Sequence, residues 1–252
     1  MPFKDYFSES AKNYAKSRPD YPPELLAYLA NLTPVHDLAW DCATGTGQAA
    51  IALAAHFNTV IASDASAQQI QAASLKSNII YRVLPAEHTD LAADSVDLIT
   101  VAQALHWFNF EDFYVEVNRV LKPNGVLAAW CYTLPRVCPE VDAIIDNLYL
   151  NITRPYWDNR RNLIDEAYQT IPFPFTKIKT PDFVIEKAWC LADFLNYLST
   201  WSGLNTYRTQ TKDNPLDRLE AMFLQAWKEP AALKRIQWPI HIVAGRKSRS
   251  ER

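Results

Sequence analysis

Short apolar runs alternate with amphipathic stretches along the first half of the chain. The apolar runs have the length of strands, and the stretches between them repeat apolar residues at helical spacing. Regular alternation of this kind favours an α/β fold, in which a mostly parallel sheet carries helices on both faces. The predicted strands lie near residues 36–41, 59–64, 79–84, 96–102 and 125–133, and the predicted helices near 47–57, 66–76 and 110–121.

The pattern changes on either side of this core. Pro22-Pro23 precede a stretch at 24–32 with apolar residues at helical spacing, so a helix is expected to start there. Residues 134–202 are rich in aromatic side chains and proline and predict a cap inserted late in the fold. Further patterns predict helices over 141–150 and 162–170, strands over 178–188 and 236–244, and an amphipathic helix over 216–227.

Composition narrows the class of protein. The 252 residues suffice for one α/β domain with an insertion. The net charge of −3 provides no broad basic field for nucleic acid, and the basic tail at 246–252 indicates a solvated terminus. No apolar run resembles a signal peptide or could span a bilayer. We therefore expect no association with a membrane. The cysteines have neither zinc-site spacing nor a C-x-x-C pair, so we expect no metal site. We expect free thiols, as in a cytoplasmic protein, at Cys42, Cys131, Cys138 and Cys190.

The turn after the first predicted strand carries the strongest chemical signal. Asp41 is followed by Gly45 and Gly47, and glycine lets a backbone approach a ligand closely. Asp64 ends the next predicted strand, 19 residues after Gly45, near the spacing at which a carboxylate accepts both ribose hydroxyls. This pattern fits a nicotinamide or flavin dinucleotide and also S-adenosylmethionine. Asp41 favours the second, because its charge would repel a pyrophosphate and attract a sulfonium.

Three later segments complete a family resemblance. They are Pro85-Ala86-Glu87, the run 94–108 that ends in His106-Trp107-Phe108, and Leu121-Lys122-Pro123-Asn124-Gly125. With the glycine turn, and in this order and spacing, they resemble class I S-adenosylmethionine-dependent methyltransferases. The most similar group is that of the small-molecule enzymes like trans-aconitate methyltransferase.

The resemblance extends over nearly the whole chain and implies its organisation. It implies a Rossmann-like, seven-stranded, mostly parallel sheet, in which 178–188 and 236–244 form the closing antiparallel pair. A helical lid precedes the core, and the cap follows it. The implied parts are a lid at 1–23, a cofactor-binding core at 24–133, a substrate cap at 134–202, and a closing helix, last strand and basic tail at 203–252.

The resemblance also assigns the cofactor site. Asp41, Gly45 and Gly47 would lie at the methionine end of S-adenosyl-L-methionine, Asp64 at its ribose, and Ala86-Glu87 at its adenine. Ala43 is a departure, because the family loop usually has a glycine there. We expect this alanine to adopt ordinary dihedral angles and to place a methyl group near the donor's amino-acid end. The other residues expected at the cofactor are Tyr14, Ala65, Gln69 and Gln103.

His106 follows the fourth predicted strand and would border the reactive centre, either as a base or as a wall. A carboxylate acceptor needs no base because it is already ionised, but it needs cations. Arg18 is the favoured cation, since the resemblance places its segment over the cleft. Arg154, Arg160, Arg161 and Arg208 are further candidates. The aromatic residues expected to wall the acceptor pocket are Tyr21, Trp107, Tyr132, Trp157 and Trp201.

These observations favour methyl transfer from S-adenosylmethionine to a small-molecule acceptor, with an oxygen nucleophile such as a carboxylate or hydroxyl. Two other functions use the same turn. One is an NAD(P)-dependent oxidoreductase, although residues 103–135 do not read as the second mononucleotide-binding half that a dinucleotide fold needs. The other is a catalytically inactive S-adenosylmethionine-binding protein. The sequence is compatible with a monomer or a homodimer.

Overall fold

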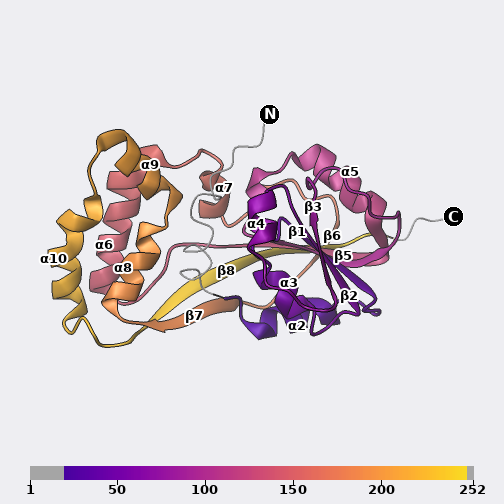
Figure 1. The fold of residues 1–252 in the computed structure, drawn as a ribbon, viewed down its shortest axis with the longest axis horizontal. Coiled ribbons are helices and arrows are strands. Elements are labelled where there is room, and N and C mark those ends of the chain that lie inside the picture. The colour runs from indigo at the N-terminus through magenta and orange to yellow at the C-terminus, as the bar shows by residue number, and fades with distance from the viewer. Residues whose placement is uncertain (1–19, 249–252) are drawn as a thin grey trace.

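The structure is a computed structural model that describes residues 20–248, and this part of the chain contains one eight-stranded sheet (Figure 1). The strands are β1 (Leu38–Cys42), β2 (Thr59–Asp64), β3 (Ile79–Val83), β4 (Val96–Ala102), β5 (Leu121–Tyr132), β6 (Thr176–Ile178), β7 (Phe183–Trp189) and β8 (Lys234–Arg246). Their order is β3-β2-β1-β4-β5-β8-β6, and β7 also pairs with β8. Strands β1 to β5 are parallel, whereas β8 is antiparallel to its neighbours. The predicted mostly parallel, Rossmann-like sheet is confirmed.

Strand β4 lies at the centre of the sheet, and residues 96–101 are all buried. A parallel strand covered on both faces is apolar along nearly its whole length. Asp97 is the charged exception. Its carboxylate accepts hydrogen bonds from the backbone N–H groups of Asp37 and Leu38 and pairs with Lys122 at 2.8 Å. This ion pair ties together the amino ends of β1, β4 and β5 and leaves their carboxyl ends for ligands.

Helices cover both faces of the core, as predicted. They are α2 (Pro23–Asn31), α3 (Gln48–Leu53), α4 (Ala67–Gln71) and α5 (Phe110–Val120). The buried side chains of Leu29 in α2 and Leu53 in α3 belong to the hydrophobic cluster on one face. Phe113 and Val117 of α5 belong to the separate cluster on the other face. The sheet is therefore the middle layer of three.

Two core helices are shorter than their sequence pattern indicated. Helix α3 ends at Leu53 and α4 at Gln71, instead of near residues 57 and 76. The Asn78 side-chain amide donates to the carbonyl oxygens of Ala54 and Phe57, at 2.9 and 3.0 Å. Carbonyl groups beyond the end of α3 are thus satisfied by a side chain, which removes the need for a further helical turn.

The predicted strand over 178–188 is wrong in one respect, because the structure divides it into β6 and β7. Both pair with β8, which has 13 residues. Residues 179–182 leave the sheet between them and include Pro181, which has no backbone N–H to donate to a ladder. The sheet therefore has eight strands where seven were expected. Strands β6 and β7 pair with successive parts of β8, so together they take the place of one strand.

Most of the remaining helices form a second lobe beside the sheet, to the left in Figure 1, whereas α7 (Arg161–Asp165) lies between this lobe and the core and contacts η2 (Leu105–Trp107). The chain enters it through α6 (Pro139–Asp146), which continues as a π-helix, η3 (Asn147–Thr153), where one regular helix over 141–150 was predicted. Strands β7 and β8 extend from the core into this lobe, and α10 packs against α6 and α8. The other elements are η2 (Leu105–Trp107), η4 (Arg154–Tyr156), α7 (Arg161–Asp165), α8 (Leu191–Ser199), α9 (Ser202–Thr211) and α10 (Pro215–Trp227).

Candidate functional site

The glycine turn joins the end of β1 to the start of α3. Gly45 and Gly47 have φ angles of 57° and 88°, in the left-handed region that glycine enters without steric cost. A Cβ atom on Gly47 would overlap the hydroxyl of Tyr81, a residue of β3. Glycine is therefore required at position 47 both by the dihedral angle and by the neighbouring side chain.

Ala43 shares this left-handed conformation, with φ of 55°, so the expectation of ordinary dihedral angles is wrong. An L-residue in this region brings its Cβ close to the following carbonyl oxygen. The turn thus keeps the backbone geometry of a glycine at a position occupied by alanine. The hydrogen bond from Thr44 N to the carbonyl oxygen of Ser63, at 2.8 Å, holds the adjacent peptide in place.

Asp41 is fully buried beneath the turn, with an exposed fraction of 0%. One carboxylate oxygen accepts a hydrogen bond from the Thr44 hydroxyl at 2.5 Å, and the other accepts one from the Thr100 hydroxyl of β4 at 2.7 Å. Burial raises the pKa of Asp41 to about 6. The hydrogen bonds from the two hydroxyls oppose this rise, because they stabilise the ionised carboxylate. The carboxylate therefore supports the turn from below.

Asp64, at the end of β2, lies directly against the turn. Its Oδ2 accepts a hydrogen bond from the backbone N–H of Gly45 at 2.9 Å, and its Oδ1 accepts one from Ser66 N at 2.8 Å. Gln69 in α4 is buried, and its Oε1 would lie 3.9 Å from a Cβ at Gly45. Ala65 is exposed beside them. Two segments separated in sequence thus meet at the turn.

The residues expected at the adenine and beyond lie on neighbouring loops. Ala86 is 8% exposed, and Glu87 Oε1 accepts a hydrogen bond from the backbone N–H of Asn109 at 3.1 Å. Gln103 follows β4 with φ of 56°, and its Oε1 accepts a hydrogen bond from Tyr132 N at 2.7 Å. Its side chain therefore links the carboxyl ends of β4 and β5. Both Gln103 and Tyr132 lie at the carboxyl ends of the parallel strands, which is where ligands bind in this architecture.

His106 lies in η2 and is only 5% exposed. Its Nδ1 is hydrogen-bonded to the Tyr168 hydroxyl at 2.9 Å, and its ring contacts Trp107 with centroids 4.8 Å apart. Burial, reinforced by the positive charges of Arg161 and Arg160, lowers the pKa of His106 to about 3. The imidazole is therefore neutral at physiological pH.

An aromatic cluster with an arginine lies near His106. The rings of Trp157 and Trp201 meet edge to face with centroids 5.7 Å apart, and Tyr149 contacts both. The Arg161 guanidinium lies 4.8 Å from the Trp157 ring centre and 5.4 Å from that of Tyr149. The predicted aromatic residues Trp157 and Trp201 are thus brought together with one of the candidate arginines. Arg160 lies separately over the Trp107 ring, at 4.6 Å.

Not every predicted residue can be placed at the site. Tyr14 and Arg18 lie outside the described residues. Tyr21 contacts the Trp130 ring edge to face at 5.2 Å and packs against the hydrophobic cluster that joins the core and the second lobe. Arg208 donates to Asn214 and to the carbonyl oxygen of Ser199.

Sequence reasoning missed two polar partners at this site, Thr100 and Tyr168. The sequence offered a signal for Thr100, because it is a polar residue in the middle of a mostly apolar central strand. Tyr168 had none, because its contact with His106 spans 62 residues of sequence.

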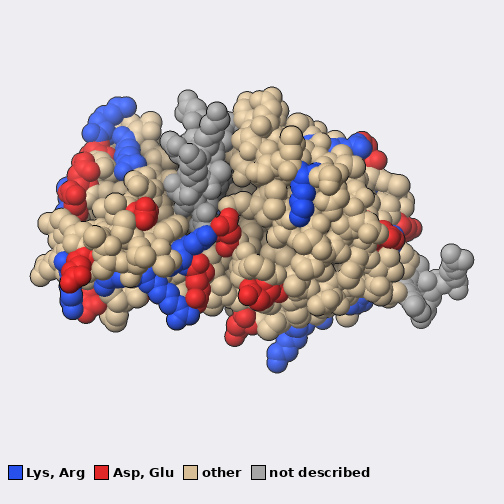
Figure 2. Space-filling view, turned by 60° about the horizontal axis from the view of Figure 1, so that its bottom comes forward, with Lys and Arg blue, Asp and Glu red and all other residues tan. Residues whose placement is uncertain are grey.

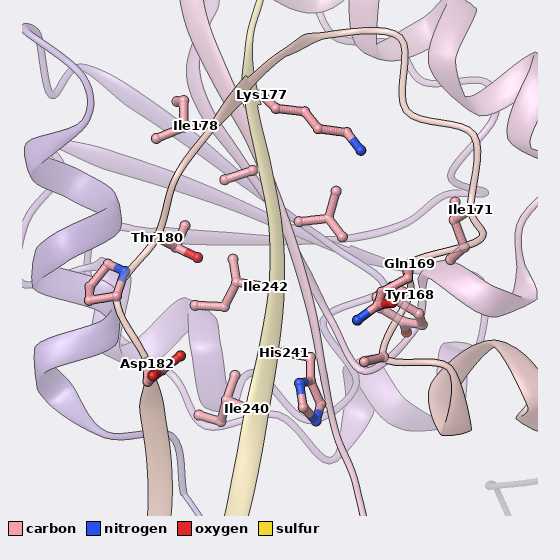
Figure 3. A pocket seen from close by; sticks show the side chains of 14 residues that line it. Tyr168, Gln169, Ile171, Lys177, Ile178, Thr180, Asp182, Ile240, His241 and Ile242 are labelled. Carbon is pink, nitrogen blue, oxygen red and sulfur yellow. The ribbon is translucent and has the colours of Figure 1, made fainter.

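A cavity of about 360 Å³ opens beside β8, where residues 179–182 leave the sheet (Figure 3). Lys177 and His241 line it on one side, together with Tyr168. Strand β8 is the third strand from β1, so this cavity lies away from the glycine turn.

On the face drawn in Figure 2, basic and acidic side chains of the described residues are interspersed.

Within residues 20–248, no group of three or more His, Cys, Asp or Glu could hold a metal ion. In the same range, no helix is both long and apolar enough to cross a bilayer.

Comparison with known proteins agrees with this geometry. Residues 40–129 match the family model described as a methyltransferase domain. A protein of Dictyostelium discoideum named as a methyltransferase is 34% identical over 97% of this chain and 96% of its own length. A solved structure from Anaeromyxobacter dehalogenans, named as a type II methyltransferase, is 41% identical, with a TM-score of 0.87 over 91% of this chain and 97% of that one. A Saccharomyces cerevisiae protein named as an S-adenosylmethionine-dependent methyltransferase is 23% identical over 96% of both chains. With the glycine turn, the acidic strand ends and the sheet order already described, these relationships show that the chain belongs to the class I S-adenosylmethionine-dependent methyltransferases.

Proposed function

We propose that this methyltransferase methylates an oxygen of a small-molecule acceptor, and that this oxygen belongs to a carboxylate. The observation that carries the proposal is Arg161. Its side chain is 15% exposed, and only its Nε has partners, the Tyr149 hydroxyl at 3.2 Å and Asp165 at 3.5 Å. Among the described residues, Nη1 and Nη2 of Arg161 have no hydrogen-bond partner. A guanidinium fixed by aromatic rings offers a planar pair of donors that matches a carboxylate.

The state of His106 favours the same acceptor. A histidine with a pKa of about 3 is a weak base at neutral pH, so it would give little help in removing a proton from a hydroxyl. A carboxylate has no proton to remove. One carboxylate oxygen would attack the donor's methyl carbon as the carbon–sulfur bond breaks, giving a methyl ester and S-adenosylhomocysteine. In this proposal His106 walls the reactive centre, and positioning supplies the catalysis.

The donor would lie over the glycine turn. We assign its methionine end to Gly45 and Gly47, its ribose to Asp64, and its adenine to Ala86 and Glu87. The hydrogen bond from Gly45 N to Asp64 supports this arrangement, because it fixes the ribose-binding carboxylate relative to the turn. The acceptor would enter between the carboxyl ends of β4 and β5 and the cap helices. We also place the enzyme in the cytoplasm, where its four free thiols would stay reduced.

A methyl-transfer assay with labelled S-adenosylmethionine tests the acceptor class. The panel contains small carboxylates, the matching primary alcohols and the matching amines. We expect transfer to carboxylates, and an Arg161→Gln variant should raise the acceptor KM at least tenfold with little change in donor affinity.

Arg154→Gln is the matched control. Arg154 lies 5.8 Å from the same Tyr149 ring, but its guanidinium already bonds Asn162 and pairs with Asp165. Its replacement should leave the acceptor KM within about twofold of the wild type. Methylation of alcohols or amines without methylation of carboxylates would refute the proposal.

A further inference from the structure

Strand β8 has a gap along one of its edges. Strand β6 pairs with residues 244–246 of β8, and β7 pairs with residues 234–240. Residues 241–243 lie between these two ladders, where the segment 179–182 leaves the sheet. The backbone groups of an unpaired strand edge are open to a partner.

The backbone N–H and C=O of Ile242 point into this gap. Ile242 lies opposite Trp130 of β5, whose carbonyl oxygen accepts a hydrogen bond from Gln103 N at 2.8 Å. Trp130 therefore turns its backbone groups toward β4, and Trp130 and Ile242 form one of the antiparallel pairs that share no hydrogen bonds. The backbone groups of Ile242 thus face the other edge of β8. Within residues 20–248, the segment 179–182 makes no backbone hydrogen bond with them.

A cavity of about 360 Å³ opens at the gap, and Ile242 is one of the residues that line it (Figure 3). This volume lies at the small end of the range for ligand sites, which measure roughly 300–1,000 Å³. Lys177 and Asp182 also line the cavity, on opposite sides of β8, and both residues are exposed. Within the described part of the chain, neither side chain has an ion pair or a hydrogen bond.

These two residues set the charges of the cavity. Burial lowers the pKa of His241, which also lines the cavity, so its imidazole is largely neutral at neutral pH. Lys177 is then the cation and Asp182 the anion. Together with the N–H and C=O of Ile242, the cavity offers a cation, an anion, a donor and an acceptor on residues that a ligand can reach.

We propose that this cavity binds a free α-amino acid with an aliphatic side chain. The carboxylate of the amino acid pairs with Lys177 and accepts a hydrogen bond from the N–H of Ile242. Its ammonium group pairs with Asp182 and donates to the carbonyl oxygen of Ile242. Its side chain packs on the apolar wall that Ile178 and Ile240 form. The inference goes beyond the proposed function, in which these residues take no part.

Titration of the S-adenosylhomocysteine complex with three matched compounds tests the inference. L-Valine carries both charged groups, isovalerate only the carboxylate and isobutylamine only the ammonium group. We expect the methyl signals of Ile240 and Ile242 in an NMR spectrum to move saturably with L-valine, with a Kd of about 1 mM or tighter. Each analogue leaves one charge of the cavity unmatched and should bind at least about fivefold more weakly.

Two variants divide the site between its charges. Lys177→Gln should weaken L-valine binding at least about fivefold and leave the Kd of isobutylamine within about twofold. Asp182→Asn should weaken L-valine binding in the same way and spare isovalerate. Lys179→Gln is the matched control, because Lys179 is a nearby exposed lysine that does not line the cavity. All three variants replace exposed residues, so the Tm and the Kd for S-adenosylhomocysteine should stay at their wild-type values.

Equal binding of the three compounds, or no saturable shift at tens of millimolar L-valine, would overturn the inference. An equal loss of L-valine binding in Lys179→Gln would do so too, because it would show a general effect of charge. Tyr168 lines the cavity and is hydrogen-bonded to His106 at 2.9 Å. Methylation of L-valine that depends on Lys177 would therefore also overturn the inference, by showing that the cavity is the acceptor pocket. The titrations involve no turnover, so failure of the proposed carboxylate acceptor would leave their results unchanged.

Discussion

Replacing Asp41 by asparagine separates the stability effect of the buried charge from its effect on the donor. The side chain is fully buried, and its pKa is raised from 3.8 to about 6, with desolvation as the main cause. A carboxyl group with a raised pKa binds its proton more tightly in the folded state. It therefore adds stability that is fully present below pH 3.8 and is lost as the pH rises through about 6.

The magnitude follows from the two pKa values. A difference of about two units corresponds to about 3 kcal/mol between fully protonated and fully ionised Asp41. Between pH 5 and pH 8 the wild type should lose about 1.4 kcal/mol of this contribution. Asparagine has nearly the same shape and no charge, and its amide can still exchange hydrogen bonds with Thr44 and Thr100. The Asp41→Asn variant should therefore gain about 1.4 kcal/mol relative to the wild type over this range.

Urea unfolding of both proteins at pH 5, 6, 7 and 8 measures this difference, because the other titrating groups are common to both and cancel. A constant difference across the series would refute the raised pKa. The functional effect should be opposite. We expect the variant to bind S-adenosylmethionine about tenfold more weakly, and S-adenosylhomocysteine, which lacks the sulfonium charge, less than threefold more weakly. Equal losses for both ligands would exclude an electrostatic role for Asp41.

Three further variants test the turn and the reactive centre. Ala43→Gly should raise the free energy of unfolding by up to about 1 kcal/mol, because glycine relieves the left-handed strain; a loss of stability would contradict this. Gly47→Ala should lower it by about 2 kcal/mol, and Tyr81→Phe in the same chain should restore part of the loss by removing the hydroxyl that the new Cβ would overlap. His106→Gln should leave the shape of the pH–kcat profile between pH 5 and 8 unchanged, since a pKa of about 3 keeps the imidazole neutral throughout; a limb that disappears with the histidine would show a base. The same variant should unfold less readily in acid, because a buried neutral histidine loses stability as the pH falls below about 6.5.

Local patterns predicted the strands and the glycine turn on which the proposed donor site is built. The spacing between Gly45 and Asp64 indicated a shared ribose site, and the structure brings the two residues into hydrogen-bond contact because β1 and β2 are neighbouring parallel strands. The same reasoning failed for Ala43. Alanine normally avoids the left-handed region, so its presence at position 43 indicated ordinary dihedral angles, whereas the turn holds its φ at 55°.

The proposed acceptor half was less predictable because the contacts around it are long-range. Arg161 was one arginine among several until the fold placed it over Trp157 and near His106. The break between β6 and β7 depends on how residues 179–182 leave the sheet, which an apolar pattern does not encode.

Isothermal titration of the purified protein with S-adenosylhomocysteine and with NAD tests the central claim most directly. The claim is that the turn and the two aspartates form a site for a phosphate-free adenosyl compound. It predicts one molecule of S-adenosylhomocysteine bound per chain with a Kd of roughly micromolar order, about −8 kcal/mol, and no measurable heat with NAD. It also predicts that Asp64→Ala weakens this binding at least tenfold. Binding of NAD without binding of S-adenosylhomocysteine would contradict the account.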